Sequence, residues 1–232
     1  MGPCVALNGL GRLIAVALIL AIVSGCGSTK PQASPLAQAV GAVAKSALDR
    51  KAAKASGGTA AAPAPVTRAD LAKLGKPILR ASVPARGVDA LLAPTDVKGN
   101  VVTWSTSNGI TLTLRNGILI QTRGLGPDLM SALAPSVAEL LVQGGTHKRQ
   151  YFFLGPDDQP TQRSYDCAVA IVGRETIEIM GRRHNVTHVT ETCSRPQGTM
   201  SNEFWIEGRI VRKSHQLLSG GAGFADFETI ID

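Results

Sequence analysis

The fold of this chain is decided by the stretch Ile110-Thr111-Leu112-Thr113-Leu114-Arg115-Asn116-Gly117-Ile118-Leu119-Ile120-Gln121-Thr122. Apolar and polar residues alternate on both sides of Asn116-Gly117. An alternation with a period of two is typical of a strand that buries one face. Asn-Gly is a preferred two-residue turn between antiparallel strands, because both residues tolerate positive φ angles. The stretch therefore predicts a β-hairpin.

The chain beyond this hairpin shows the same alternation, interrupted by short turns. Gly-Pro-Asp-Asp, Gly-Arg-Glu and Gly-Arg-Arg-His read as three of these turns, and a further hairpin is expected around Gly208. Sequential strands with tight connections indicate an antiparallel meander rather than βαβ units. The expected strands are Arg149–Leu154, Thr161–Val172, Thr176–Met180, Asn185–Cys193, Asn202–Glu207, Arg209–Leu217 and Phe224–Ile231.

Residues 126–144 interrupt the β pattern. Leu129, Leu133, Val137 and Leu141 recur every four residues, which predicts an apolar helical stripe. Pro135 is expected to split it into two short helices, the second beginning just before residue 136. A further short helix is expected after Thr67, a typical N-cap residue. The predicted fold class is mainly β: a curved antiparallel sheet or partly closed β-barrel packed around a short central helix, with a flexible N-terminal tether.

The amino terminus has the layout of a bacterial export signal. The apolar run Leu13–Val23 follows Arg12 and is short for a membrane span. Val23-Ser24-Gly25-Cys26 matches a lipobox, in which the cysteine thiol accepts a diacylglyceryl group; the alternative is an ordinary signal peptide with a chance cysteine. We expect residues 1–25 to be a lipoprotein signal peptide and Cys26 to be the lipidated residue. Gly27 stands where aspartate would signal inner-membrane retention, which favours the periplasmic face of the outer membrane.

The segment after the lipobox has the composition of a tether. Residues 26–66 are rich in alanine and proline, which favours a solvated spacer; a weak helix whose cationic side rests on anionic lipid is the alternative. Residues 67–232 are then the β-rich domain. The formal net charge of +7 suits anionic headgroups or acidic polysaccharide, or serves solubility alone, whereas export disfavours nucleic acid as a partner.

Two cysteines are left after Cys4 departs with the signal and Cys26 takes the lipid. Cys167 and Cys193 form an even pair in an oxidising compartment, and neither belongs to a Cys-x-x-Cys motif. We expect them to form a disulfide.

Catalytic, metal and cofactor sites are not predicted. His184 and His188 lie four residues apart, but Glu191 falls on the opposite face of the expected strand, so the pair lacks a third ligand. The sequence contains no Gly-x-Ser-x-Gly elbow and no phosphate-binding glycine loop before a helix. Trp104 and Trp205 are candidate carbohydrate contacts, because aromatic rings on a sheet stack on sugars; filling the core is the alternative role.

A family resemblance extends from about Ala69 to the end of the chain. The residues that carry it are Trp104, 114–119, 124–126, 165–167, Gly173, Glu175, 191–193, Asn202, 204–206 and 208–214. In their order and spacing they resemble the YjbF/GfcB lipoproteins, a family associated with group 4 capsule and related exopolysaccharide export. The resemblance implies a non-enzymatic accessory protein that works with an outer-membrane barrel and periplasmic proteins of a polysaccharide secretion system. It supplies no catalytic residues.

Two other classes of function are weighed against this one. A LolA-like carrier would hold a lipid or acyl chain in the concave sheet and would need an apolar cavity open to solvent. A polysaccharide-modifying enzyme would need a cleft with convergent titratable groups. The leading expectation is an accessory lipoprotein that assists assembly or export of capsular or extracellular polysaccharide, with the polysaccharide itself a candidate ligand.

Overall fold

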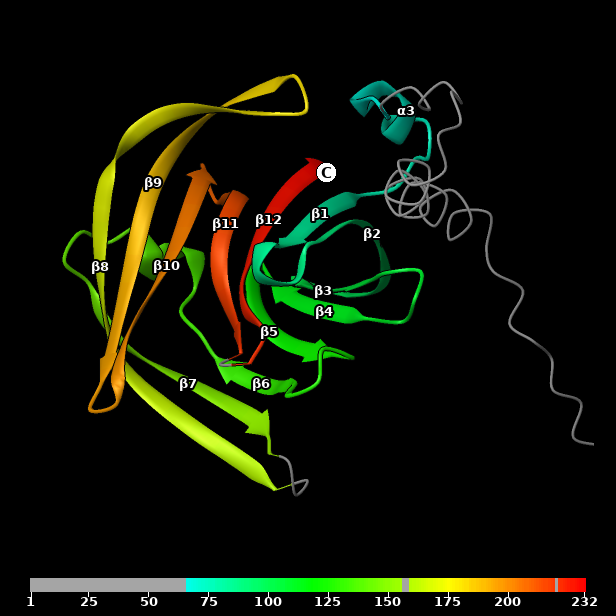
Figure 1. Ribbon diagram of the computed structural model, residues 1–232. Helices are drawn as coiled ribbons and strands as arrows, with labels where there is room; N and C mark the ends of the chain where they lie inside the picture. The colour runs from blue at the N-terminus through cyan, green and yellow to red at the C-terminus, as the bar shows by residue number, and fades with distance from the viewer. Residues whose placement is uncertain (1–65, 156–158, 220) are drawn as a thin grey trace, which may run out of the picture. The chain divides into compact units, whose positions relative to one another are not determined.

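The computed structural model describes residues 66–155, 159–219 and 221–232 (Figure 1). The predicted signal peptide, Cys26 and nearly all of the predicted tether lie outside these residues. The elements in chain order are α3 (Arg68–Ala72), β1 (Ile78–Val83), the 3-10 turn η1 (Pro84–Arg86), β2 (Val88–Lys98), β3 (Val101–Ser105), β4 (Thr111–Arg115), β5 (Ile118–Arg123), β6 (Leu129–Leu133), α4 (Val137–Leu140), β7 (Thr146–Leu154), β8 (Pro160–Ile179), β9 (Arg182–Arg195), β10 (Gly198–Glu207), β11 (Ile210–Ser219) and β12 (Gly223–Ile231).

All twelve strands belong to one antiparallel sheet that curls into a nearly closed barrel. The strand order is β5-β4-β3-β2-β1-β12-β11-β10-β9-β8-β7-β6, so β5 and β6 are its two ends. These ends meet through side chains rather than a backbone ladder. Thr122 Oγ1 donates to Asp128 Oδ1 at 3.0 Å and accepts from the Leu129 N–H at 2.9 Å. The predicted fold class is confirmed.

The predicted Asn-Gly hairpin is formed by β4 and β5. Asn116 and Gly117 have φ angles of +50° and +82°, as a two-residue hairpin turn requires. A Cβ on Gly117 would lie 2.7 Å from the Cβ of Val211 in β11, so this turn packs closely against the far side of the barrel. Gln216 of β11 fastens the hairpin by accepting from the Leu119 N–H and donating to the Gly117 carbonyl, each at 2.9 Å.

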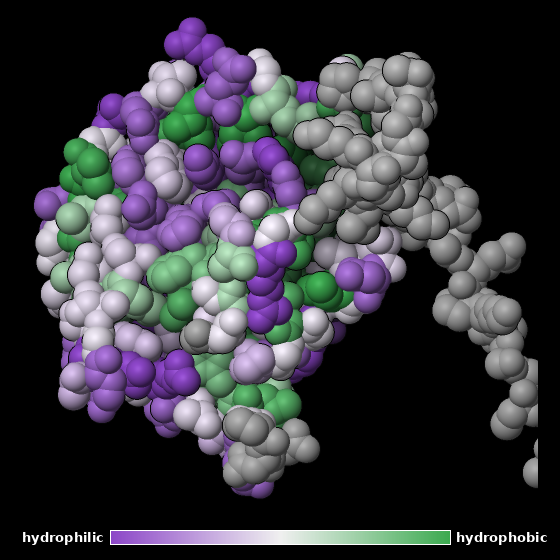
Figure 2. Space-filling view, viewed as in Figure 1, coloured by the Kyte–Doolittle hydropathy of each residue, from purple (hydrophilic) through white to green (hydrophobic). Residues whose placement is uncertain are grey.

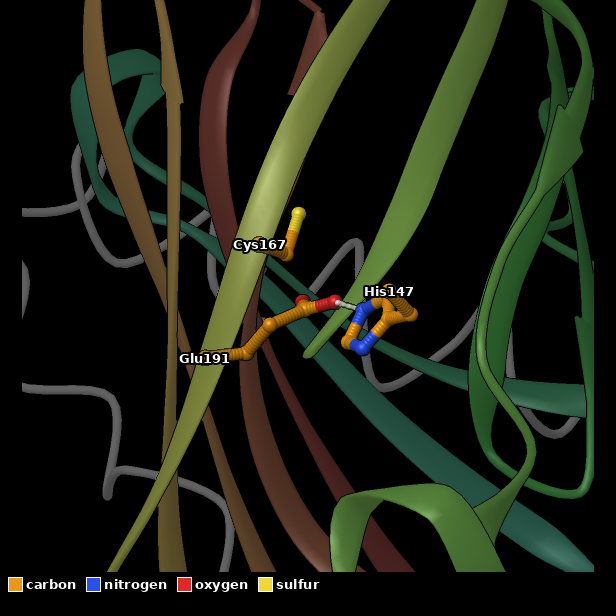
Figure 3. Close-up of side chains that lie close together, drawn as sticks. All are labelled: His147, Cys167 and Glu191. Carbon is orange, nitrogen blue, oxygen red and sulfur yellow. Dashed lines mark hydrogen bonds and ion pairs between the residues drawn. The ribbon is translucent and has the colours of Figure 1, made fainter. Parts of the chain in front are cut away.

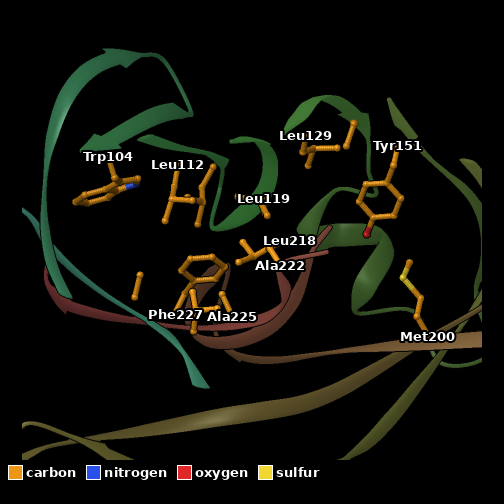
Figure 4. Packing of buried hydrophobic residues seen from close by; sticks show 14 of the residues in the cluster. Trp104, Leu112, Leu119, Leu129, Tyr151, Met200, Leu218, Ala222, Ala225 and Phe227 are labelled. Carbon is orange, nitrogen blue, oxygen red and sulfur yellow. The ribbon is translucent and has the colours of Figure 1, made fainter. Parts of the chain in front are cut away.

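The core is divided into two main apolar clusters by a layer of polar side chains. Along β10, Met200 belongs to the first cluster and Phe204 to the second, with buried Asn202 between them. Along β9, Cys193 and Val189 flank buried Glu191 in the same way. Figure 4 shows the first cluster, in which Trp104, Leu112, Tyr151 and Phe227 pack with smaller residues. Side chains from many strands therefore occupy the barrel interior.

The helix predicted over the first half of residues 126–144 is wrong. Residues 129–133 form strand β6, which pairs with β7 through Ala132 and Tyr151, among other residues. Leu133, expected on the buried stripe, is 58% exposed. Apolar residues at a spacing of four are compatible with a helix or with a strand. Pairing with β7 makes this segment a strand. The second predicted helix does form: Ser136 caps α4, which buries Val137 and Leu140 in the second cluster.

The turn predicted at Gly173-Arg174-Glu175 is also wrong. These residues pair with residues 186–188 of β9, and a bulge between Ile171 and Gly173 carries β8 through as one strand of 20 residues. Glycine is found at bulges as well as at turns, so Gly173 alone did not distinguish the two structures.

The long β8–β9 hairpin extends past its neighbours. We call residues 173–186 the arm: here β8 has no partner in β7, and β9 has none in β10. Figure 1 shows the arm bending over the ends of β10, β11 and β12 toward α3. Its tip is held there by a third apolar cluster, which joins Ile179 to Leu71 of α3, Ile78 of β1 and Ile230 of β12.

The predicted cap of α3 is confirmed. Thr67 and Asp70 form a capping box, in which the Asp70 N–H donates to Thr67 Oγ1 at 3.2 Å. Hydrogen bonds from Thr67 and from the Lys73 ammonium lower the pKa of the Asp70 carboxyl to about 2. None of the helices formed by the described residues is long and apolar enough to cross a membrane.

Candidate functional site

The main candidate site is a cleft at the base of the arm, which we call the arm cleft. It has a volume of about 870 Å³ and lies where β8 and β9 leave the sheet, beside the end of α4 and the β10–β11 turn. The surface over β8 and β9 in Figure 2 is mostly hydrophilic or neutral, with isolated hydrophobic residues. The cleft is lined by Leu141, Ile171, Gly173, Arg174, Glu175, Thr176, Asn185, Val186, Thr187, Ile206 and Gly208.

The polar groups of the arm cleft differ in whether they already form hydrogen bonds or ion pairs within the protein. Arg174 is exposed and makes no ion pair or hydrogen bond with any described residue. Thr176 Oγ1 donates to Asn185 Oδ1 at 2.8 Å, and the Asn185 amide nitrogen has no partner in the described chain. The cleft therefore offers a cation and an amide donor beside the half-buried apolar side chains of Leu141 and Ile171.

Glu175, the carboxylate of the arm cleft, is held by groups on the neighbouring strands. Trp205 Nε1 donates to Glu175 Oε1 at 2.6 Å, and His188 Nδ1 lies 3.5 Å from the same oxygen. His188 also stacks on the Trp205 ring, with centroids 4.5 Å apart. Lys213, which pairs with Trp205 from the opposite strand, lies over the ring at 4.9 Å. Both faces of Trp205 are therefore occupied by protein side chains.

The two tryptophans nominated as carbohydrate contacts lie in different environments. Trp104 is 8% exposed and belongs to the first apolar cluster. Trp205 is half-buried and lies next to the arm cleft through Glu175. The structure does not bring the two rings together, and their proposed contact with sugar stays a prediction.

A second group of functional side chains lies in the polar layer of the core. We call His147, Arg149 and Glu191 the central ion cluster. His147 Nε2 lies 2.6 Å from Glu191 Oε1, and Arg149 Nε donates to that oxygen at 3.0 Å. Asn202 Nδ2 donates to Glu191 Oε2 at 2.7 Å. Glu191 and Arg149 are 0% and 1% exposed, so each charge depends on the other for compensation.

The electrostatics of this cluster favour the charged forms of both partners. Burial raises the pKa of Glu191, but the Arg149 charge and the hydrogen bonds from His147 and Asn202 outweigh it, so that the pKa lies below its usual value. Burial lowers the pKa of Arg149, whereas Tyr151 and Glu191 raise it, and the balance is upward. Glu191 is therefore a poor proton donor or acceptor near neutral pH, and its role in the core is that of a fixed counter-ion.

A metal-ligand geometry arises in the same place. One donor atom from each of His147, Cys167 and Glu191 lies within 4.8 Å of the other two (Figure 3). Cys167, however, forms the predicted disulfide with Cys193, so its sulfur is not a thiolate. Glu191 is already bonded by three side chains. In the oxidised protein these residues do not fit a metal ion, because a thiolate is the form that binds one.

A third group repeats the chemistry of the central cluster at the base of the arm. We call His184, Glu207 and Arg212 the outer ion cluster. His184 Nδ1 lies 3.0 Å from Glu207 Oε2, and Arg212 Nε donates to that oxygen at 2.8 Å. The hydrogen bond from His184 lowers the pKa of Glu207; burial opposes this effect, and the hydrogen bond from Arg212 adds to the lowering. His184 and His188 thus have separate carboxylate partners and do not form a joint site.

The sequence did not reveal either ion cluster. Arg149 and Glu191 are 42 residues apart, and only the pairing of β7, β8 and β9 brings them together. A buried charge carries a weak local signal: Glu191 is flanked by Val189 and Cys193 at a spacing of two. That signal marks a charge on the buried face of a strand, but it does not identify its partner.

The comparisons with known proteins agree with the fold. A family model described as group 4 capsule polysaccharide lipoprotein GfcB, YjbF matches residues 40–230. The fold is similar to that of the hypothetical lipoprotein YmcC from Escherichia coli (K12), with a TM-score of 0.64 and 19% identity, covering 72% of this chain and 89% of that chain. No curated protein matches the chain.

The family resemblance expected from short motifs is thus confirmed over most of the chain. The structural likeness, at so low an identity, shows the shared fold alone. The family model carries the assignment, since it spans nearly all of the described domain. The chain belongs to the YjbF family of group 4 capsule polysaccharide lipoproteins.

Proposed function

We propose that this chain is a lipoprotein anchored through Cys26 to the periplasmic face of the outer membrane, where it assists the assembly or export of a capsular or extracellular polysaccharide. The single observation that carries the proposal is the family match, which describes capsule polysaccharide lipoproteins. The lipobox ending at Cys26 supports the anchor. Its partners are then an outer-membrane barrel and periplasmic proteins of the secretion system.

The protein acts in this proposal without catalysis of its own. The buried carboxylate, Glu191, is tied to Arg149 and has a lowered pKa, so it is poorly suited to proton transfer near neutral pH. Glu175 of the arm cleft is engaged by Trp205 and His188. The carrier alternative needs an open apolar cavity, whereas two apolar clusters and a polar layer occupy the interior of the described barrel. No observation favours that alternative.

Deletion of the gene tests the accessory role. The amount and chain length of surface polysaccharide are measured in the deletion strain and after complementation with the intact gene. We expect a reduced amount or an altered length distribution that the intact gene restores. Unchanged surface polysaccharide would refute the role.

The anchor and the absence of catalysis are tested separately. The Cys26→Ser variant should lose the lipid and leave the outer-membrane fraction; Cys4→Ser is the matched control, because Cys4 precedes the expected cleavage site.

The absence of catalysis is tested with purified protein. Incubation with the isolated polysaccharide should leave the size distribution of the polysaccharide unchanged. A shift in that distribution would establish an enzyme.

A further inference from the structure

We propose that the arm cleft binds a carboxylate-bearing sugar, a uronic acid residue within a polysaccharide chain, and that Arg174 is the partner of the carboxylate. This inference rests on the proposed function for the polysaccharide as ligand class. The arm cleft specifies where on the protein the polysaccharide binds and indicates that the bound sugar is negatively charged.

The charge balance of the cleft is the first argument. Arg174 has no partner among the described residues, whereas Glu175 is engaged by Trp205 Nε1 at 2.6 Å and by His188. The cleft thus presents a free guanidinium beside a carboxylate that is already satisfied. Arginine suits a carboxylate ligand because its planar fork can donate two parallel hydrogen bonds.

The rest of the lining suits a pyranose ring. Leu141 and Ile171, both half-buried, supply apolar surface for the C–H face of a sugar. Thr187 and the free amide nitrogen of Asn185 supply hydrogen-bonding groups for hydroxyls. The volume of about 870 Å³ lies within the range of roughly 300–1,000 Å³ typical of ligand clefts.

The state of Trp205 explains why the ligand is expected to be charged. Neutral sugars are commonly held by stacking on an open aromatic face, but His188 and Lys213 cover the two faces of this ring. Recognition in the arm cleft must therefore depend on the ion pair with Arg174 and on hydrogen bonds. A neutral polysaccharide of the same length cannot form the ion pair with Arg174, which we expect to contribute more than the hydrogen bonds.

The test compares two ligands that differ only at C6, where one carries a carboxylate and the other a neutral hydroxymethyl group. Hexagalacturonate and its carboxyl-reduced counterpart are titrated calorimetrically into the purified full chain in detergent. We expect the acidic hexamer to bind at least tenfold more tightly than the reduced one. Arg174→Gln should weaken binding of the acidic hexamer at least tenfold. Lys98→Gln, which removes the same charge at the remote β2–β3 hairpin, should leave it unchanged.

Several outcomes would overturn the inference. These are equal affinity for the two hexamers, no binding of the acidic hexamer, or equal weakening by both substitutions, the last of which would indicate general attraction to a basic protein. Because Arg174 is exposed, equal thermal unfolding of variant and parent verifies that the fold is intact. If gene deletion alters surface polysaccharide but the Arg174→Gln gene restores it fully, the proposed function stands and this inference fails.

Discussion

The two ion clusters contain the same three residue types in the same arrangement but differ in the burial of the glutamate. In each, a glutamate accepts a bond from the Nε of an arginine and lies within 3.0 Å of a histidine nitrogen. Glu191 of the central cluster is 0% exposed, whereas Glu207 of the outer cluster is 33% exposed. Because the partners are of the same types, a difference in stability between the two clusters can be assigned to the burial of the glutamate.

Burial makes the members of the central cluster mutually dependent. Water compensates part of the charge of Glu207 if a partner is lost, but it does not reach Glu191 or Arg149. Removing one charge from a buried pair leaves the other unpaired in a medium of low polarity. Loss of the Glu191 charge should therefore affect folding strongly, and loss of the partly exposed Glu207 charge weakly.

The largest expected effect is that of Glu191→Gln. This change removes the counter-ion of buried Arg149 and should lower the free energy of unfolding by about 3–5 kcal/mol, measured by denaturant titration. Glu207→Gln is the matched control. Equal losses in the two variants would show that burial does not distinguish the clusters.

The disulfide should have a comparable effect and should be coupled to only one cluster. Replacing Cys167 and Cys193, which are 26 residues apart, by serine should cost about 3–4 kcal/mol of unfolding free energy in the chain-entropy model. Because Cys193 lies two residues from Glu191 on the same strand, the double change with Glu191→Gln should be non-additive. Combination with Glu207→Gln should be additive, and coupling there would contradict the separation of the clusters.

Acid should weaken the central cluster in a defined direction. The pKa values of Glu191 and Glu207 in the folded protein both lie below the ordinary value for glutamate, so the unfolded chain binds more protons as the pH falls below about 5. The stability that these groups contribute is present above the unfolded pKa and is lost as the pH falls through the folded pKa. In unfolding measurements from pH 6 to pH 3, Glu191→Gln and Glu207→Gln should each flatten the loss of stability.

The smallest expected effect is that of Glu207→Gln at neutral pH. Glu207 is 33% exposed, and Arg212 keeps Asp232 as a second carboxylate partner at 2.5 Å, so the loss should be about 0–1 kcal/mol and the midpoint of denaturation should move little. Arg149→Gln, in contrast, should approach the effect of Glu191→Gln. A loss above about 2 kcal/mol for Glu207→Gln would mean that the outer cluster is effectively buried beneath the arm.

The parts of the fold that could be predicted from the sequence are those whose signals are local. Asn116-Gly117 predicted a hairpin because the two-residue turn needs positive φ at both positions. Thr67 predicted one helix start, since its side chain accepts the N–H three residues on, and Pro135 predicted the start of a second helix close to residue 136. The signals at Leu129 and Gly173 were local too, but each was compatible with two structures. Pairing with β7 and β9 decided between them.

The candidate site depends on contacts that have no local signal. Glu175 meets Trp205 across three strands, 30 residues away. The arm cleft exists because β8 and β9 extend beyond β7 and β10, a difference in strand length that single segments do not reveal. Cys167 and Cys193 were predictable as a pair because the number of candidates was small.

The contact between α3 and the arm tip has a mechanical consequence. The chain that precedes residue 66 joins the domain at α3, whose Leu71 shares an apolar cluster with Ile179 at the tip. A pull along that chain reaches this small cluster before it reaches β1, which is hydrogen-bonded on both sides by β2 and β12. The first element to yield under tension would be the attachment of the arm, and the barrel would keep its shape while the arm cleft changed.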